Sequence, residues 1–170
     1  MEVLKKIFSP PSFNTDDLNR RSKFLTIILL CGIIFDIMIF VLSLFFHWPN
    51  GQIVTLIVFI MFLVAFLSLM KGKLNFAAFL TLFALSTAVF TNMYFSVGIY
   101  DLSAYLIPFI IIISAFLLKK KWFIVFSFFL LLFFVAVALG AWNFNRNLPT
   151  PMSDFYGDLI LLIIFFLSQL

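Results

Sequence analysis

The chain has 170 residues, of which 65% are hydrophobic and only 11% are charged, and its formal net charge is +4. A soluble domain is typically about half apolar and about a quarter charged, so a water-soluble fold could not cover this much apolar surface. Ten of the eleven Lys and Arg residues lie in short clusters before or between apolar runs. This distribution argues against a nucleic-acid partner and indicates the turns of a protein whose main partner is the lipid bilayer.

Residues 1–23 form a polar and basic lead. Apolar residues between Val3 and Phe8 recur at helical spacing opposite Lys5 and Lys6, which predicts a short helix in the cytoplasmic headgroup layer. Pro10 ends that pattern.

A second helix is predicted to begin just before the first apolar run. Asn14 or Thr15 can cap it. Ion pairs at i,i+4 spacing can then support its first turns, and the expected pairs are Asp16 with Arg20 and Asp17 with Arg21.

Five apolar runs are long enough to cross a bilayer core of about 30 Å as helices. A sixth run stops at Leu170 and is too short to cross, so we expect it to be the start of a span in a longer protein. The predicted fold is an all-α polytopic transmembrane helical bundle over residues 24–170. The expected spans are 24–46, 52–70, 74–97, 102–118, 122–142 and the incomplete 158–170.

The basic residues predict the orientation of the bundle. With six alternating spans, the lead and the Lys-rich turns at Lys71–Lys73 and Lys119–Lys121 share one side, and only Arg146 lies on the other. The positive-inside rule places the N-terminus and both Lys-rich turns in the cytoplasm, with the chain in the plasma (inner) membrane.

Asp36 is the one acidic residue deep in a predicted span. A charged carboxylate there costs about 2.5–3.5 kcal/mol on insertion scales, so we expect a protonated or hydrogen-bonded group. It is either a proton or cation relay or ligand contact, or a neutral acid bonded to a facing helix. The third span also carries Asn75 and Asn92 with several hydroxyl residues, which either line a polar cavity or form interhelical hydrogen bonds. Pro108 is expected to kink the fourth span.

The best candidate for a ligand site is a shallow pocket at the outer face, beneath the 143–157 loop. Aromatic and polar residues near the outer span ends would gather there, and the expected ligand-binding residues are Tyr94, Tyr100, Asp101, Tyr105 and Trp142.

No catalytic motif is found, so the residues shown are not expected to be an enzyme or to need a cofactor. A single cysteine, Cys31, and a single histidine, His47, cannot supply a metal site. Cys31 is expected to be small buried filler, and His47 an ordinary residue at the membrane interface.

The layout resembles the N-terminal multi-pass membrane region of bacterial sensor histidine kinases and diguanylate cyclases. The resemblance covers nearly the whole chain and consists of short segments in a fixed order. These are Phe13 with Asp16-Asp17 and Arg20-Arg21 before the first span, the basic turn Met70–Leu74, the outer turn Gly98–Asp101 before Tyr105–Pro108, and Leu117–Lys121.

The resemblance implies a membrane-embedded sensor or anchor that passes a signal from the outer face to a cytoplasmic output domain absent from this chain. It also implies a homodimer. Two alternatives are a small transporter or channel subunit that uses Asp36, and a structural partner of another membrane protein. The last would dock through small residues spaced four apart, such as Ala84 with Ala88 and Ala136 with Gly140.

Overall fold

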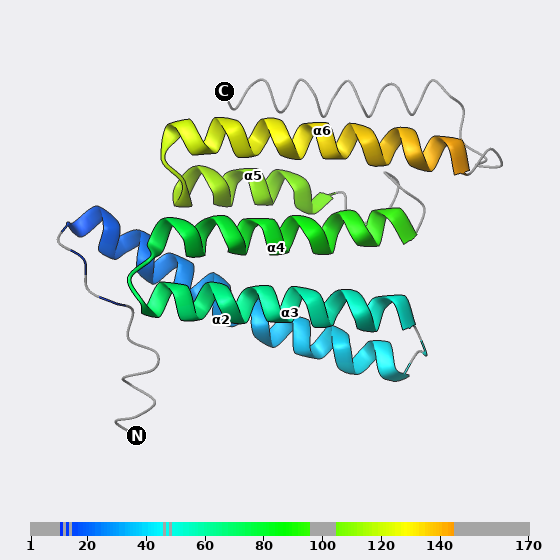
Figure 1. The fold of residues 1–170 in the computed structure, drawn as a ribbon, viewed down its shortest axis with the longest axis horizontal. Helices are drawn as coiled ribbons and strands as arrows, with labels where there is room; N and C mark the ends of the chain where they lie inside the picture. Colours follow the sequence, from blue (N-terminus) through cyan, green and yellow to red (C-terminus); the bar gives the residue numbers. More distant parts are fainter. Residues whose placement is uncertain are drawn as a thin grey trace. The chain divides into compact units, whose positions relative to one another are not determined.

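The computed structural model describes Pro11, Phe13, residues 15–45, His47, residues 49–95 and residues 105–144. Within these ranges the chain forms α-helices, which confirms the predicted all-α class (Figure 1). The helices are α2 (Asp16–Phe45), α3 (Pro49–Met70), α4 (Leu74–Phe95), α5 (Leu106–Leu117) and α6 (Lys120–Phe144). The predicted short helix near the N-terminus and the sixth apolar run lie outside the described residues.

Three of these helices are long and apolar enough to cross a membrane: Asp16–Phe45, Gly51–Met70 and Leu74–Met93. The chain is therefore a candidate multi-pass membrane protein. At the expected fourth span the described helix α5 has 12 residues, or about 18 Å of helix. Pro108 lies in the first turn of α5, where a missing backbone N–H breaks no helical hydrogen bond. The described part of α5 therefore does not show the kink expected at Pro108.

The described helices fall into two compact units. The first contains α2, α3, residues 74–88 of α4 and Ala115–Leu118. The second contains Val89–Ser114, which includes the end of α4 and most of α5, and the whole of α6.

In the first unit, α2 packs directly on α3 (Figure 1). Four of the six buried positions on α2 recur every seventh residue, a spacing that keeps one side of a helix facing a neighbour. Those on α3 alternate between steps of four and three residues, the same knobs-into-holes spacing. The seam of α2 is formed by Ser22, Leu29, Asp36 and Ser43, and that of α3 by Val58, Phe62, Ala65 and Leu69.

The other faces of both helices are apolar and exposed, as Ile34, Phe35 and Leu63 illustrate. Such faces suit a lipid solvent, in which apolar surface costs nothing to expose. Cys31 is exposed on one of them, so the expectation that it is buried filler is wrong.

The start of α2 follows the predicted capping, with Thr15 as the cap. The Leu18 N–H donates to Thr15 Oγ1 at 3.4 Å, and the Asn19 side chain exchanges two hydrogen bonds with the Phe13 backbone. Of the two predicted ion pairs, Arg21 Nε to Asp17 Oδ2 is formed at 3.0 Å. Arg20 lies 3.8 Å from Asp17, in place of the expected Asp16, because an i,i+3 pair also faces the same side of a helix.

The turn between α3 and α4 is a hydrogen-bonded helix cap. Gly72 N–H donates to Leu69 O at 2.8 Å and Lys73 N–H to Ser68 O at 2.9 Å, the pair of bonds that defines a Schellman motif. Gly72 has φ of 76°, a left-handed conformation that glycine adopts at no steric cost. The chain therefore reverses within three residues, and α4 starts back in the opposite direction (Figure 1).

Aromatic rings pack within the second unit. The Phe90 and Phe133 ring centroids lie 5.1 Å apart, and Phe129 and Phe133 are 5.7 Å apart. Such tilted pairs are favourable beyond the area they bury. They join the end of α4 to the middle of α6.

Candidate functional site

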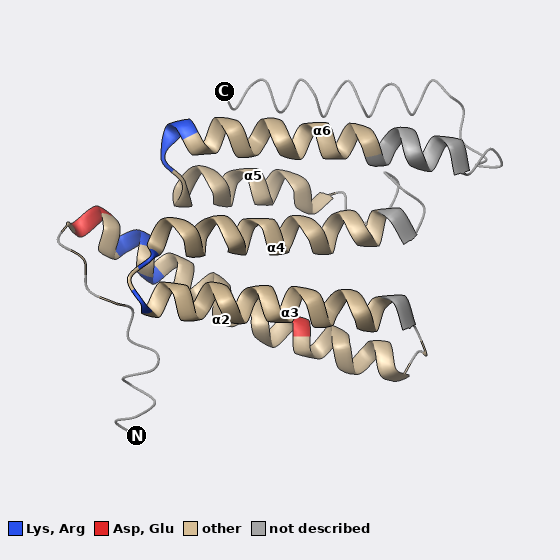
Figure 2. Cartoon of the chain, in the orientation of Figure 1, with Lys and Arg blue, Asp and Glu red and all other residues tan. Residues whose placement is uncertain are grey.

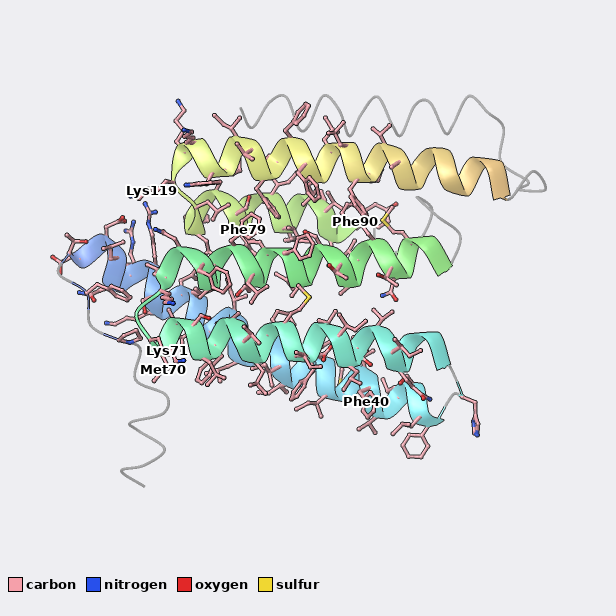
Figure 3. All side chains as sticks on the ribbon, viewed as in Figure 1. Phe40, Met70, Lys71, Phe79, Phe90 and Lys119 are labelled. Carbon is pink, nitrogen blue, oxygen red and sulfur yellow. The ribbon has the colours of Figure 1, made fainter. Side chains whose placement is uncertain are left out.

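Asp36 lies on the buried seam of α2 and is 6% exposed. Beside it is a cavity of about 170 Å³ between α2 and α3. Figure 2 shows this acidic position past the middle of α2, far from the charged start of the helix, and Figure 3 labels Phe40, one turn further on. The cavity is lined by Asp36, Ile37 and Phe40 from α2 and by Thr55, Leu56 and Phe59 from α3.

Thr55 is the other polar side chain in this cavity, and its hydroxyl is already engaged. Thr55 Oγ1 lies 2.9 Å from Gly51 O and 3.1 Å from Gln52 O, both on its own helix. Among the described residues, no hydrogen bond or ion pair is formed by the Asp36 carboxyl. The interhelical bond expected for it is therefore not made within the described residues, and the carboxyl keeps its capacity to accept or donate.

Two contacts fix α2 against α3 on either side of Asp36. A Cβ atom added at Gly32 would lie 3.0 Å from Phe62 Cζ, so the absence of a side chain lets the ring pack against the α2 backbone. Near the other end of α2, Gln52 Nε2 donates to Ser43 O at 3.3 Å. The carboxyl is held on a closely packed helix pair, which limits how far its surroundings can relax.

Sequence reasoning identified Asp36 but missed Gly32, Phe62 and Thr55. Gly32 lies four residues before Asp36, on the same side of a helix, and this spacing was the available signal. Phe62 had no signal, because phenylalanine lies on every face of these apolar runs.

Three hydroxyl residues of α4 donate hydrogen bonds to backbone carbonyls of their own helix. Thr81 Oγ1 donates to Ala77 O, Ser86 Oγ to Leu82 O and Thr87 Oγ1 to Phe83 O, each within 2.9 Å. Hydroxyls in apolar helices commonly satisfy themselves on the preceding turn in this way. Asn75 is exposed in the first turn of α4 and Asn92 is half-buried near its end, so the two amides lie five helical turns apart.

The predicted outer pocket falls largely outside the described residues. Tyr100 and Asp101 lie outside them, and only the backbone is described for Tyr94 in α4 and Trp142 in α6. Tyr105 is 73% exposed just before α5. The ligand-binding role of these five residues stays a prediction.

Small-residue faces and metal ligands add little to the site. Ala84 is fully buried, so it packs within this chain and is not free to dock a partner. Within the described ranges, no group of three or more His, Cys, Asp or Glu side chains could hold a metal ion.

Comparison with known protein families, with curated proteins and with solved structures finds no match to this chain.

Proposed function

We propose that this chain is the membrane-embedded anchor and input module of a bacterial signal-transduction protein of the histidine kinase or diguanylate cyclase type. The observation that carries the proposal is a single buried carboxyl, Asp36, without a described partner on a tightly packed pair of long apolar helices. A carboxyl at such an interface can bias helix packing, because forming or losing one bond there changes the preferred contact. Transport would need further polar groups along a path.

The proposed topology has five complete spans and the start of a sixth, with the N-terminus in the cytoplasm. Within the first unit, the basic positions near the start of α2 and in the turn between α3 and α4 lie at the same end (Figure 2), as the positive-inside rule requires of one membrane side. In this proposal, α5 and α6 are the fourth and fifth spans. The outer ends carry the ligand site, and two copies of the chain work together.

The test uses the native protein. The transcript is sequenced through the codon for Leu170, and the native membrane protein is sized by blotting. A product that continues into a cytoplasmic kinase or cyclase domain supports the proposal. A product with no such domain overturns it.

Signalling is then measured as the output activity of the native-length protein with Asp36→Asn and with Asp36→Leu. The matched control is Ile34→Leu, an exposed position on the same helix. We expect both Asp36 variants to shift basal output at least severalfold and the control to leave it unchanged. Equal output from all three would remove Asp36 from the mechanism.

A transporter or channel subunit is the second candidate, and the cavity of about 170 Å³ beside Asp36 is the observation that favours it. It is large enough for several water molecules of about 30 Å³ each, but its exposed lining is apolar, so this function depends on the Asp36 carboxyl turning into the cavity. This function predicts proton or cation flux in proteoliposomes that Asp36→Asn abolishes. Identical flux from wild type and variant would rule out the transport role of Asp36.

A further inference from the structure

A second cavity, of about 440 Å³, lies at the basic end of the first unit. The first turns of α2 form one wall and the end of α5 forms the other. The cavity is lined by Asp17, Arg20, Arg21, Phe24, Ala115 and Phe116, which all belong to the first unit.

The polar half of this cavity carries more positive charge than its own acid can neutralise. Asp17 pairs with Arg21 at 3.0 Å and lies 3.8 Å from Arg20, so one carboxylate serves two guanidinium groups. The Arg20 side chain is 85% exposed and that of Arg21 is 26% exposed. Each guanidinium has five N–H donors, so most of them remain available to an anion.

The apolar half is formed by two phenylalanine rings. The Phe24 and Phe116 centroids lie 6.0 Å apart with an interplanar angle of 59°. Phe24 begins the apolar run of α2, and Arg20 precedes it by four residues, or about 6 Å along a helix. The cavity therefore passes from charged to apolar over about one helical turn.

A cavity that is positively charged at one end and apolar at the other matches one class of molecule. We propose that the cavity binds an anionic phospholipid, with its phosphate on Arg20 and Arg21 and the start of its acyl chains against Phe24 and Phe116. Basic pockets between transmembrane helices bind anionic headgroups in this way, and guanidinium groups hold phosphate by charge-assisted hydrogen bonds. A free phosphate would use only the polar half, and a zwitterionic lipid would bring no net charge to offset the arginines.

The test is native mass spectrometry of the purified protein in mild detergent, titrated with dioleoyl phosphatidylglycerol or dioleoyl phosphatidylcholine. We expect the wild type to prefer phosphatidylglycerol. The double variant Arg20→Gln with Arg21→Gln should bind phosphatidylglycerol about tenfold more weakly, or weaker still. Arg20→Gln alone changes only a highly exposed side chain, so it should retain the fold and still lose part of the preference.

Asp17→Asn provides a test of opposite sign. Removing the competing carboxylate leaves both guanidinium groups to the lipid, so phosphatidylglycerol should bind several times more tightly than in wild type. A weaker or unchanged affinity would contradict the proposed position of the phosphate.

Lys71→Gln with Lys73→Gln is the matched control. It removes two positive charges from the turn between α3 and α4, where Figure 3 labels Lys71, outside the cavity lining. If it lowers the affinity for phosphatidylglycerol as much as the double arginine variant does, the lipid is attracted by the overall positive charge and the specific site is rejected. Glycerol phosphate that binds as tightly as phosphatidylglycerol would show that the apolar half adds nothing, and would reject a lipid site in favour of a free-anion site.

Discussion

Phe62 of α3 packs its ring against Gly32 of α2 so closely that an added Cβ would lie 3.0 Å from Cζ and 3.2 Å from Cε2. Contacts this short are tighter than side chains normally make, so any larger residue at position 32 must displace the ring. The pair sets the spacing of α2 and α3 one turn before Asp36.

We therefore expect Gly32→Leu to destabilise the protein by about 1–3 kcal/mol, as overpacking does in other cores. Phe62→Ala should relieve that clash, so the two changes should be coupled by about 1–3 kcal/mol in a double-mutant cycle. The measurement is unfolding by sodium dodecyl sulfate in mixed micelles, followed by circular dichroism. Cys31→Leu, at an exposed position, is the control. Additive effects at positions 32 and 62 would show that the two residues are not in contact.

Gly72→Ala should cost about 1–2 kcal/mol in the same assay, because an L-residue at φ of 76° is strained. No atom lies within 4 Å of the added Cβ, so the whole cost comes from the backbone. Gly72→Asn should lose less stability than Gly72→Ala, since asparagine tolerates this conformation. Equal stability of the alanine variant and the wild type would show that the turn does not adopt this cap.

Asp36→Leu should leave the free energy of unfolding unchanged or raise it by about 1–3 kcal/mol, because it replaces a polar group without a described partner by an apolar one. Asp36→Asn should be less stable than Asp36→Leu, since an amide in the same cavity still lacks a partner. A large loss of stability in the leucine variant would mean that the carboxyl is bonded to another part of the chain or to a second copy.

Cysteines placed at His47 and Lys73 should react with an impermeant thiol reagent from opposite sides of the membrane. The two positions flank α3, which is long and apolar enough to span. The experiment needs Cys31→Ser, because the natural cysteine is exposed. Position 73 should label only after the cytoplasmic face is opened. Labelling of both positions from one side would exclude α3 as a span.

Much of the helix pattern was predictable from the sequence, because lysines and glycines interrupt the apolar runs where the chain turns. The second expected span ended at Met70 and the third began at Leu74, as α3 and α4 do. The start of the fourth expected span lies outside the described residues, and the described helix there begins at Leu106.

Helix packing was not predictable, and the reason is physical. In these helices apolar residues occupy every face, so hydropathy cannot tell a seam from a lipid-facing side. Asp36 stood out because a carboxyl is costly in lipid, whereas its neighbours Leu56 and Phe59 resemble many other residues. The hydroxyls of α4 show a related limit, because a serine or threonine can bond to its own helix, as Thr81 and Ser86 do, as easily as to another.

The three-residue cap at Lys71–Lys73 has a mechanical consequence. Because two backbone hydrogen bonds close the turn over Gly72, α3 and the start of α4 have little slack between them. If α3 slides or rotates against α2, the adjoining end of α4 is therefore expected to move with it, because the short turn couples the two helix ends.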